Sequence, residues 1–180
     1  MGLRASPTVQ LHFSDMRVPG DRLLGQLGSG FIYAMQSLDN GRLGIAAQAV
    51  GIAEAALRAA AAYAAERKQF GKPIKEFQAI QFRLADMATR VSSSRALLHA
   101  AATAKDRGER ITQFSSMAKL QASEAAMWVT TQAIQIFGGY GYVTDYPVER
   151  LFRDAKVTEL YEGTSEIQRI VIAREMYSHT

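Results

Sequence analysis

Residues 31–66 read FIYAMQSLDNGRLGIAAQAVGIAEAALRAAAAYAAE, and this stretch decides which fold the chain can adopt. Apolar residues recur in it at helical spacing, with Leu38, Ile45, Ile52 and Tyr63 among them. Alanine fills much of the remaining surface, which lets neighbouring helices approach closely. The stretch therefore predicts one long helix at the centre of a helical bundle.

The rest of the chain supplies the other helices of that bundle. Apolar periodicity predicts a second helix over residues 76–107, which Gly108 ends, and a third over residues 112–137. A shorter helix follows Pro147, and a last helix begins with Thr164 as its N-cap. Three long helices joined by short connections predict an all-α, up-and-down helical bundle.

The first 30 residues differ from everything after them. Val9, Leu11 and Phe13 alternate with polar residues, which predicts a strand, and residues 15–30 read as a glycine-rich loop. A lone strand leaves its ladder groups unpaired, so we expect it to join a sheet outside this sequence, the helices or another chain. We therefore divide the chain into a β/loop remnant, residues 1–30, and a helical domain, residues 31–180.

Composition excludes several kinds of chemistry. The 180 residues are 48% hydrophobic, which is enough for one domain with a substantial core. The absence of cysteine excludes disulfides, thiolate metal sites and cysteine nucleophiles. His12, His99 and His179 are scattered without metal-ligand spacing, so we predict no metal site.

The charge pattern does not indicate a nucleic-acid or membrane partner. The net charge is +4 and the pI is about 9.5, yet the basic residues are dispersed among acids without a run of five. No apolar stretch of about 18 residues is free of charge, and the N-terminus has no signal-peptide pattern. A mild positive balance suits phosphate-bearing small molecules.

A bend between the last two predicted helices carries one acidic residue. Tyr161-Glu162-Gly163-Thr164 interrupts the helical pattern. Glycine after Glu162 lets a ligand approach the backbone closely, and the free N–H groups of the next helix point back to the bend. Two interpretations remain open: Glu162 is a catalytic base, or it is an acid that faces the positive end of a helix.

A polar segment, Asp39-Asn40-Gly41-Arg42, lies inside the predicted long helix. Asp39 and Arg42 are three residues apart and share a face, so an ordinary surface ion pair explains them. Gly41 argues against that explanation, because glycine in a helix interior is unfavourable and usually marks a close approach.

Two further segments have features of a ligand site. Residues 67–73 combine three cations with a glycine and a proline. In this segment Arg67 could bind a pyrophosphate, and Phe70 could pack against a flat ring. A hydrated surface loop is the simpler explanation. In residues 135–141, QIFGGYG, a helix C-cap explains one glycine but not three, and small residues would admit a flat or diphosphate ligand. The spacing is not a dinucleotide fingerprint.

Six segments in order resemble the C-terminal half of the acyl-CoA dehydrogenases: DNGR, ERKQFG, FQAIQ, QIFGGYGY, YPVERLFRDAK and YEGTSEIQR. The opening LHFSDMRVP and GQLGSGF also resemble the end of that family's middle β-domain. These flavoenzymes introduce an α,β double bond into fatty acyl-CoA thioesters. The resemblance covers essentially the whole chain and is nearest to the short- and medium-chain type.

The resemblance implies roles for the residues of the bend and the long helix. Glu162 would be the base that removes the α-proton of the thioester while a hydride passes to the flavin, and its backbone N–H would bind the thioester carbonyl. Some relatives, including the isovaleryl type, carry the catalytic glutamate on the long helix; the matching position here is Gly41, which leaves Glu162 as the candidate. The implied substrate contacts are Asp39, Asn40, Gly41, Arg42 and Gly163.

The resemblance also implies FAD as the cofactor. Its adenosine diphosphate half would contact Arg67, Gln78, Gln135, Ile136, Phe137, Gly138 and Gly139, usually across a dimer interface, and Thr164, Ser165 and Glu166 would contact it beside the base. The family's N-terminal helical domain and most of its middle β-domain lie outside this sequence. We therefore expect the chain alone to hold FAD weakly or not at all.

The implied partners are an acyl-CoA substrate, an electron-transfer flavoprotein as electron acceptor, and further copies of the chain in a homodimer or homotetramer. The implied location is the bacterial cytoplasm or the mitochondrial matrix. Two other functions stay open: a non-catalytic, DNA-associated relative of these enzymes, and an acyl-CoA oxidase, which would use the same base but reoxidise its flavin with oxygen.

Overall fold

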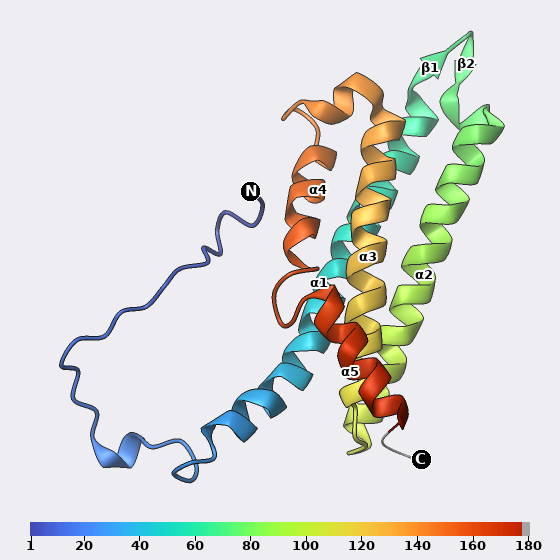
Figure 1. Cartoon of the computed structure of the whole chain (residues 1–180). Coiled ribbons are helices and arrows are strands. Elements are labelled where there is room, and N and C mark those ends of the chain that lie inside the picture. Colours follow the sequence, from blue (N-terminus) through green and yellow to red (C-terminus); the bar gives the residue numbers. More distant parts are fainter. Residues whose placement is uncertain (178–180) are drawn as a thin grey trace.

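Three long antiparallel helices form the body of the molecule, and two shorter helices pack beside the third (Figure 1). The computed structural model describes residues 1–177; His179, one of the three histidines, lies outside the described residues. The helices are α1 (Gly30–Glu66), α2 (Gln78–Asp106), α3 (Thr112–Phe137), α4 (Val148–Val157) and α5 (Ser165–Tyr177). The predicted all-α bundle is confirmed.

Short elements join the helices. A small antiparallel hairpin, β1 (Lys68–Gln69) and β2 (Lys72–Pro73), connects α1 to α2 and pairs Lys68 with Pro73. Single 3-10 turns span Gly20–Arg22, Ile74–Glu76 and Gly138–Tyr142. The hairpin occupies the break that the sequence predicts as a loop, and α3 has the predicted bounds.

The core is a layer of alanine between α1 and α3. Small side chains let the two helix backbones approach closely, and α1 packs more extensively on α3 than on any other element. The buried alanines are Ala46, Ala49, Ala53, Ala56, Ala60 and Ala64 on α1, and Ala118, Ala122, Ala126 and Ala133 on α3. By length and composition alone α1 could also span a membrane, but this alanine face is that of a core helix.

An aromatic cluster closes the core where α1 and α3 end together. The rings of Tyr63 and Phe137 stack with their centroids 4.1 Å apart, and Tyr146 meets both edge-on at 6.2 and 5.4 Å. Such contacts add to the stability that burial of the rings provides. The cluster therefore ties the hairpin end of α1 to the glycine-rich turn after α3.

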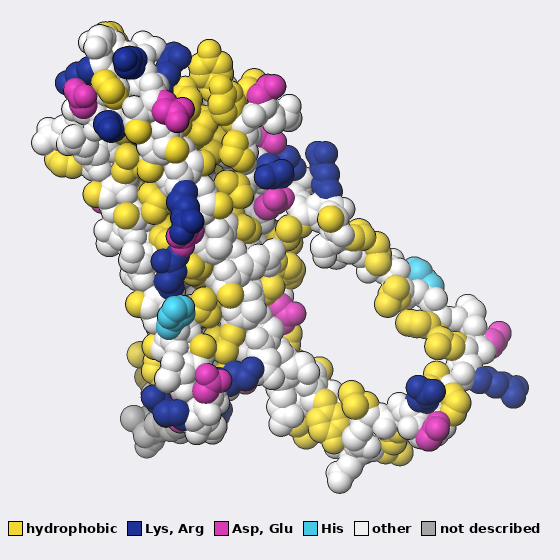
Figure 2. All heavy atoms as spheres, turned by 180° about the vertical axis from the view of Figure 1, so that it is seen from behind, with side chains coloured by type: hydrophobic (Ala, Val, Ile, Leu, Met, Phe, Trp, Pro, Cys, Tyr) yellow, Lys and Arg dark blue, Asp and Glu magenta, His cyan; other side chains and the backbone are white. Residues whose placement is uncertain are grey.

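The N-terminal segment corrects one prediction. Residues 9–13 form no strand, and Val9, Leu11 and Phe13 are 68%, 74% and 70% exposed. Figure 2 shows the segment standing away from the bundle, with hydrophobic side chains along it. Its first residues return to α4, where the N–H of Leu3 donates to Asp154 Oδ1 at 2.6 Å. The alternating pattern is present, but a strand needs a paired neighbour, and none lies beside this segment among residues 1–177.

The alanine layer predicts that the same substitution changes the free energy of unfolding very differently at two neighbouring positions. Ala56 is fully buried, whereas Ala55 is exposed. Ala56→Leu should lower the free energy of unfolding by ~1–3 kcal/mol, because a larger side chain forces α1 and α3 apart. Urea unfolding measures this value. Ala55→Leu is the control and should stay within about 0.5 kcal/mol of wild type; equal effects at both positions would contradict a close α1–α3 contact.

Candidate active site

The site is built on a backbone bend between α4 and α5. Glu162 and Gly163 both have left-handed backbone angles, with φ of 54° and 89°. This region is unfavourable for glutamate by ~1–3 kcal/mol, so the surrounding structure must hold Glu162 there. The N–H of Ser165 closes the bend by donating to the carbonyl of Glu159 at 3.0 Å. Thr164 caps α5 as predicted, because its Oγ1 accepts from the N–H of Ile167 at 3.4 Å.

Two buried side chains hold the inner side of the bend. Nζ of Lys119, on α3, donates to the carbonyl oxygen of Gly163 at 2.7 Å. Nε2 of Gln168, on α5, donates to the carbonyls of Glu162 and Gly163 at 3.0 and 2.9 Å. Lys119 and Gln168 are both fully buried. Neither residue was singled out from the sequence, because a lysine and a glutamine within helical patterns look like solvated positions.

The carboxylate of Glu162 lies against α1 at Gly41. A β-carbon built on Gly41 would overlap Oε2 of Glu162 and lie only 2.7 Å from its carboxyl carbon. Gly41 is therefore a glycine because the carboxylate occupies the space of a side chain. Within residues 1–177, no backbone carbonyl accepts the N–H of Glu162, which leaves that donor available.

Asp39 and Arg42 form a pair that is more buried than the surface pair considered above. Arg42 Nη1 donates to Asp39 Oδ1 at 2.6 Å, and the hydroxyl of Thr112 donates to Asp39 Oδ2 at 2.9 Å. Arg42 is 6% exposed, and its buried Nε has no hydrogen-bond partner among the described residues. Asn40, by contrast, is exposed. The structure thus brings Asp39, Gly41 and Arg42 to the bend side of the helix.

A groove beside Asp39 and Arg42 adds two arginines that the sequence did not reveal. Arg110 precedes α3, and Arg174 lies near the end of α5. Both pair with the carboxylate of Glu175, from which Arg110 Nη2 lies 2.8 Å away and Arg174 Nη2 lies 3.7 Å away. The groove has a volume of about 380 Å³, and apolar side chains from the start of α1 line its other wall: Phe31, Ile32 and Met35. No local motif could have grouped residues so distant in the sequence.

Burial shifts the pKa of several groups around the bend. Desolvation lowers the pKa of Lys119 from 10.5 to about 8, and the charge of Glu159 opposes that shift. Burial also raises the pKa of the Tyr161 phenol, whose hydroxyl bonds Gln48 Oε1. The backbone N–H of Glu166, at the start of α5, holds the pKa of that carboxyl below its usual value. A positive helix end and a buried ammonium therefore flank the bend.

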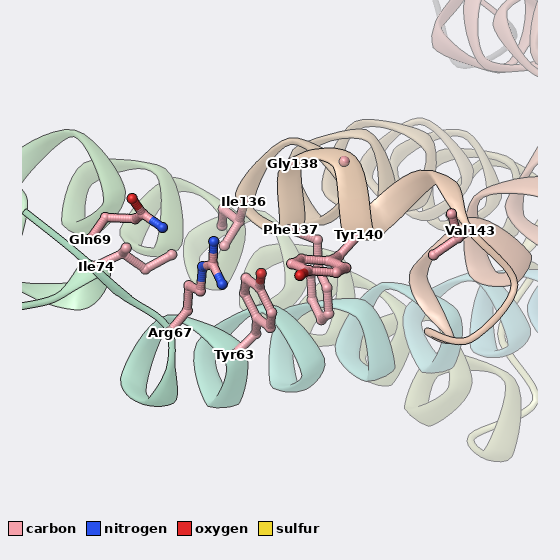
Figure 3. Close-up of a pocket in the computed structure, with 10 residues that line it drawn as sticks. Tyr63, Arg67, Gln69, Ile74, Ile136, Phe137, Gly138, Tyr140 and Val143 are labelled. Atoms are coloured by element: carbon pink, nitrogen blue, oxygen red, sulfur yellow. The ribbon is translucent and has the colours of Figure 1, made fainter.

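The residues implied for FAD do not form one site within a single chain. Arg67, Ile136, Phe137, Gly138 and Gly139 line a cavity of about 490 Å³ where α1 and α3 end (Figure 3). Gln135 lines a different cavity beside α4, and Gln78 is exposed at the start of α2. Thr164, Ser165 and Glu166 lie at the bend.

The two groups lie at opposite ends of α3. Lys119 marks the bend end and Gly138 the other, and 19 helical positions separate them by about 28 Å. The glycine-rich turn therefore does not border the bend, as a single cleft would require. A ligand that contacts both groups must reach the second one on another copy of the chain or extend along the bundle.

The cavity at the glycine-rich turn has the chemistry of a nucleotide site. The guanidinium of Arg67 lies 5.4 Å from the ring centroid of Tyr140. Gly138 has φ of 62°, and a β-carbon on Gly139 would meet open space. An arginine beside aromatic rings and accessible backbone suits an adenosine diphosphate group. Within residues 1–177, no three His, Asp or Glu side chains are placed to hold a metal ion.

Comparison with known proteins decides the family. A sequence model described as "Acyl-CoA dehydrogenase, C-terminal domain" matches residues 28–177. The chain belongs to the acyl-CoA dehydrogenase family. Within this family it is 57% identical, over 96% of its length, to the mitochondrial short-chain specific acyl-CoA dehydrogenase of Bos taurus, of which it covers 42%.

Two more comparisons find similar proteins with other descriptions. The chain is 54% identical to the acryloyl-CoA reductase (NADH) of Anaerotignum propionicum over 98% of its own length and 45% of that protein. A solved structure described as the electron transferring flavoprotein of Acidaminococcus fermentans superposes with a TM-score of 0.91 at 53% identity, over 92% of this chain and 43% of that one. The chain thus spans less than half the length of the relatives it matches.

The buried lysine makes a prediction about stability and pH. Below pH 8 Lys119 is protonated in both the folded and the unfolded chain, and above pH 10.5 it is neutral in both. Between these values the unfolded chain binds a proton that the folded chain has released, so the free energy of unfolding should rise with pH, by about 3 kcal/mol in all. Urea unfolding of wild type and Lys119→Met from pH 8 to 10.5 measures this gain.

Lys119→Met serves as the reference in that experiment because it removes only one titrating group. Burial raises the pKa of Tyr63 and Tyr161, so ionisation of these tyrosines lowers the free energy of unfolding at the alkaline end of the range. This loss is the same in both proteins and therefore cancels in the difference between them. A difference between the two proteins that stays constant with pH would show that Lys119 does not titrate in this window.

Proposed function

We propose that this chain is the C-terminal helical part of an FAD-dependent acyl-CoA dehydrogenase that acts on short-chain acyl-CoA thioesters. The observation that carries the proposal is the carboxylate of Glu162 in the space left by Gly41. A lone carboxylate fixed between a strained bend and a helix, at positions that match the family's motifs, is suited to remove a proton from carbon. This is the first step of α,β-dehydrogenation.

Glu162 supplies two functions in this proposal. Its carboxylate removes the α-proton of the thioester. Its backbone N–H, which no backbone carbonyl accepts within residues 1–177, donates to the thioester oxygen, where negative charge develops. The bend thereby places the base and an oxyanion donor on one residue.

Bound FAD would supply the hydride acceptor that the chemistry at the β-carbon requires. Thr164, Ser165 and Glu166 at the bend would hold it near the base, and Arg67, Gln78, Gln135, Ile136, Phe137, Gly138 and Gly139 would hold an adenosine diphosphate group. Because these two sets lie at opposite ends of α3, we propose that a second copy of the chain completes the cofactor site in a homodimer or homotetramer.

The groove beside Arg42 suits the remainder of an acyl-CoA. Arg110 and Arg174 line it and provide positive charge for phosphates, and Phe31 and Met35 provide an apolar wall. Asp39 and Arg42 join this groove to the bend, so one extended ligand can reach both. The identity to a short-chain specific dehydrogenase supports a short acyl group.

The rest of the reaction cycle follows from the family. Residues 1–30 would belong to the middle β-domain, where Val9, Leu11 and Phe13 would find a paired strand. An electron-transfer flavoprotein would reoxidise the flavin, in the bacterial cytoplasm or the mitochondrial matrix. Formation of peroxide on turnover would indicate an acyl-CoA oxidase instead, and salt-dependent binding of duplex DNA would favour a non-catalytic relative.

The similarity to the acryloyl-CoA reductase supports a second candidate function, in which the same site reduces an α,β double bond. A protein 54% identical to this chain is described as an NADH-dependent acryloyl-CoA reductase. The same carboxylate can return a proton to the α-carbon when the double bond is reduced. Assays with saturated and α,β-unsaturated thioesters, the latter with NADH, separate the two directions.

Replacing the base tests the proposal directly. Glu162→Gln keeps the size of the side chain but removes the basic oxygen. In the complete protein that carries this chain, turnover of butyryl-CoA should fall by ~10²–10⁴-fold, measured as bleaching of the flavin or reduction of an artificial acceptor. Activity within tenfold of wild type would rule out Glu162 as the base.

A pair of glycines on α1 provides a matched test of geometry. Gly41→Ala places a methyl group where the carboxylate of Glu162 lies, so kcat/KM should fall about tenfold or more through displacement of the base. Gly44→Ala lies on the same helix but is exposed and meets open space, so kcat/KM should stay within about twofold of wild type. Equal activity of the two variants would contradict the contact between Glu162 and α1.

A further inference from the structure

Lys119 and Gln168 approach the bend from the inside of the protein. In the part of the chain that the structure describes, Lys119 makes one hydrogen bond, to the carbonyl of Gly163, and no ion pair within 4.0 Å. Gln168 donates to both carbonyls of the bend, while its buried Oε1 has no hydrogen-bond partner among residues 1–177. Both side chains therefore donate to the carbonyl of Gly163, and Gln168 donates in addition to the carbonyl of Glu162.

Stability alone does not explain a lysine at this position. A fully buried ammonium group loses its hydration, and an apolar side chain of similar volume is often neutral or stabilising in its place. Met87, on the neighbouring helix, shows that the core accommodates long apolar side chains. The lysine must therefore provide something that a methionine cannot, and its one hydrogen bond leads to the bend.

We propose that Lys119 is a positioning residue for the catalytic bend, acting together with Gln168. By drawing the carbonyls of Glu162 and Gly163 inward, the two side chains fix the backbone of both residues in the left-handed region. The carboxylate of Glu162 then faces α1. The inference rests on the proposed function, because it assigns Lys119 to the support of the base proposed there.

The acidic residues around Lys119 also favour a position of the bend close to α3. Glu159, Glu162 and Glu166 belong to the segment that forms the bend or begins α5, and all three attract the ammonium group. Arg42, on α1, repels it. Lys119 is thus held by acids of the segment it supports, and the attraction keeps that segment against α3. Gly163 completes the fit, because a β-carbon there would lie 2.7 Å from Nε2 of Gln168.

The test compares Lys119→Met with Thr130→Val in the complete, flavin-loaded protein. Thr130 is buried on the same helix, and among the described residues 1–177 its hydroxyl bonds only the carbonyls of Ala126 and Met127, both within α3. With butyryl-CoA, kcat should fall ~10–100-fold in Lys119→Met, because a small displacement of the base has a large effect on rate. It should stay within about twofold in Thr130→Val.

A second measurement reports on the bend without catalysis. Hydrogen exchange of the Ser165 amide, which closes the bend on Glu159, should be at least tenfold faster in Lys119→Met than in wild type and unchanged in Thr130→Val. Gln168→Met should act in the same direction. The double variant should lose more kcat than the product of the single effects, because the carbonyl of Gly163 then has no donor.

The outcomes separate this inference from the proposed function. An inactive Glu162→Gln with Lys119→Met indistinguishable from Thr130→Val in both measurements would overturn the positioning role alone. An active Glu162→Gln would overturn the proposed base, while the exchange of Ser165 would still report on the bend. If Lys119→Met does not fold, Gln168→Met decides, and unchanged kcat and exchange in that variant would overturn the inference.

Discussion

The close contact between the alanine faces of α1 and α3 is the constraint on which the rest of the structure depends. It brings Gly41 and Arg42 of α1 near Lys119 of α3. Lys119 is flanked in the sequence by the buried residues Ala118 and Ala122. Larger side chains along this contact would move α1 away from the bend that Lys119 holds. The same feature that makes the core dense therefore sets the distance between Glu162 and the helix it faces.

The sequence was sufficient to predict the helices, because apolar residues recur in them at helical spacing and their ends are recognisable. Thr164 as an N-cap and the glycines after Phe137 were readable for the same reason. It was also sufficient to select Glu162 and Gly41, although not to connect them. Only the fold shows that the carboxylate of one fills the side-chain space of the other.

Other parts could not be read from the sequence for physical reasons. Val9 to Phe13 have the alternation of a strand, but pairing depends on a neighbour that local pattern does not supply. Lys119 lies in a helical pattern, where lysine normally indicates a solvent-exposed face, yet tertiary contacts bury it. Arg110 and Arg174 line the same groove although they are 64 residues apart in the sequence, and no motif links them.

The two sets of residues proposed to contact the cofactor lie at opposite ends of α3. In the proposed function, the end near Lys119 would support proton transfer, and the end near Gly138 would offer arginine, aromatic rings and open backbone to a nucleotide. A rigid helix of about 39 Å in α3 keeps the two ends at a fixed distance. An assembly of several chains can then place one chain's nucleotide end beside another chain's base.

The most direct test of the central claim is a structure of the complete protein with a non-reactive acyl-CoA analogue bound. If Glu162 is the base, the α-carbon should lie about 3–3.5 Å from one of its carboxylate oxygens. The thioester oxygen should lie about 2.7–3.1 Å from the backbone nitrogen of Glu162. A bound analogue whose α-carbon faces another acid, or no acid, with Glu162 turned away from Gly41, would show that Glu162 is not the base.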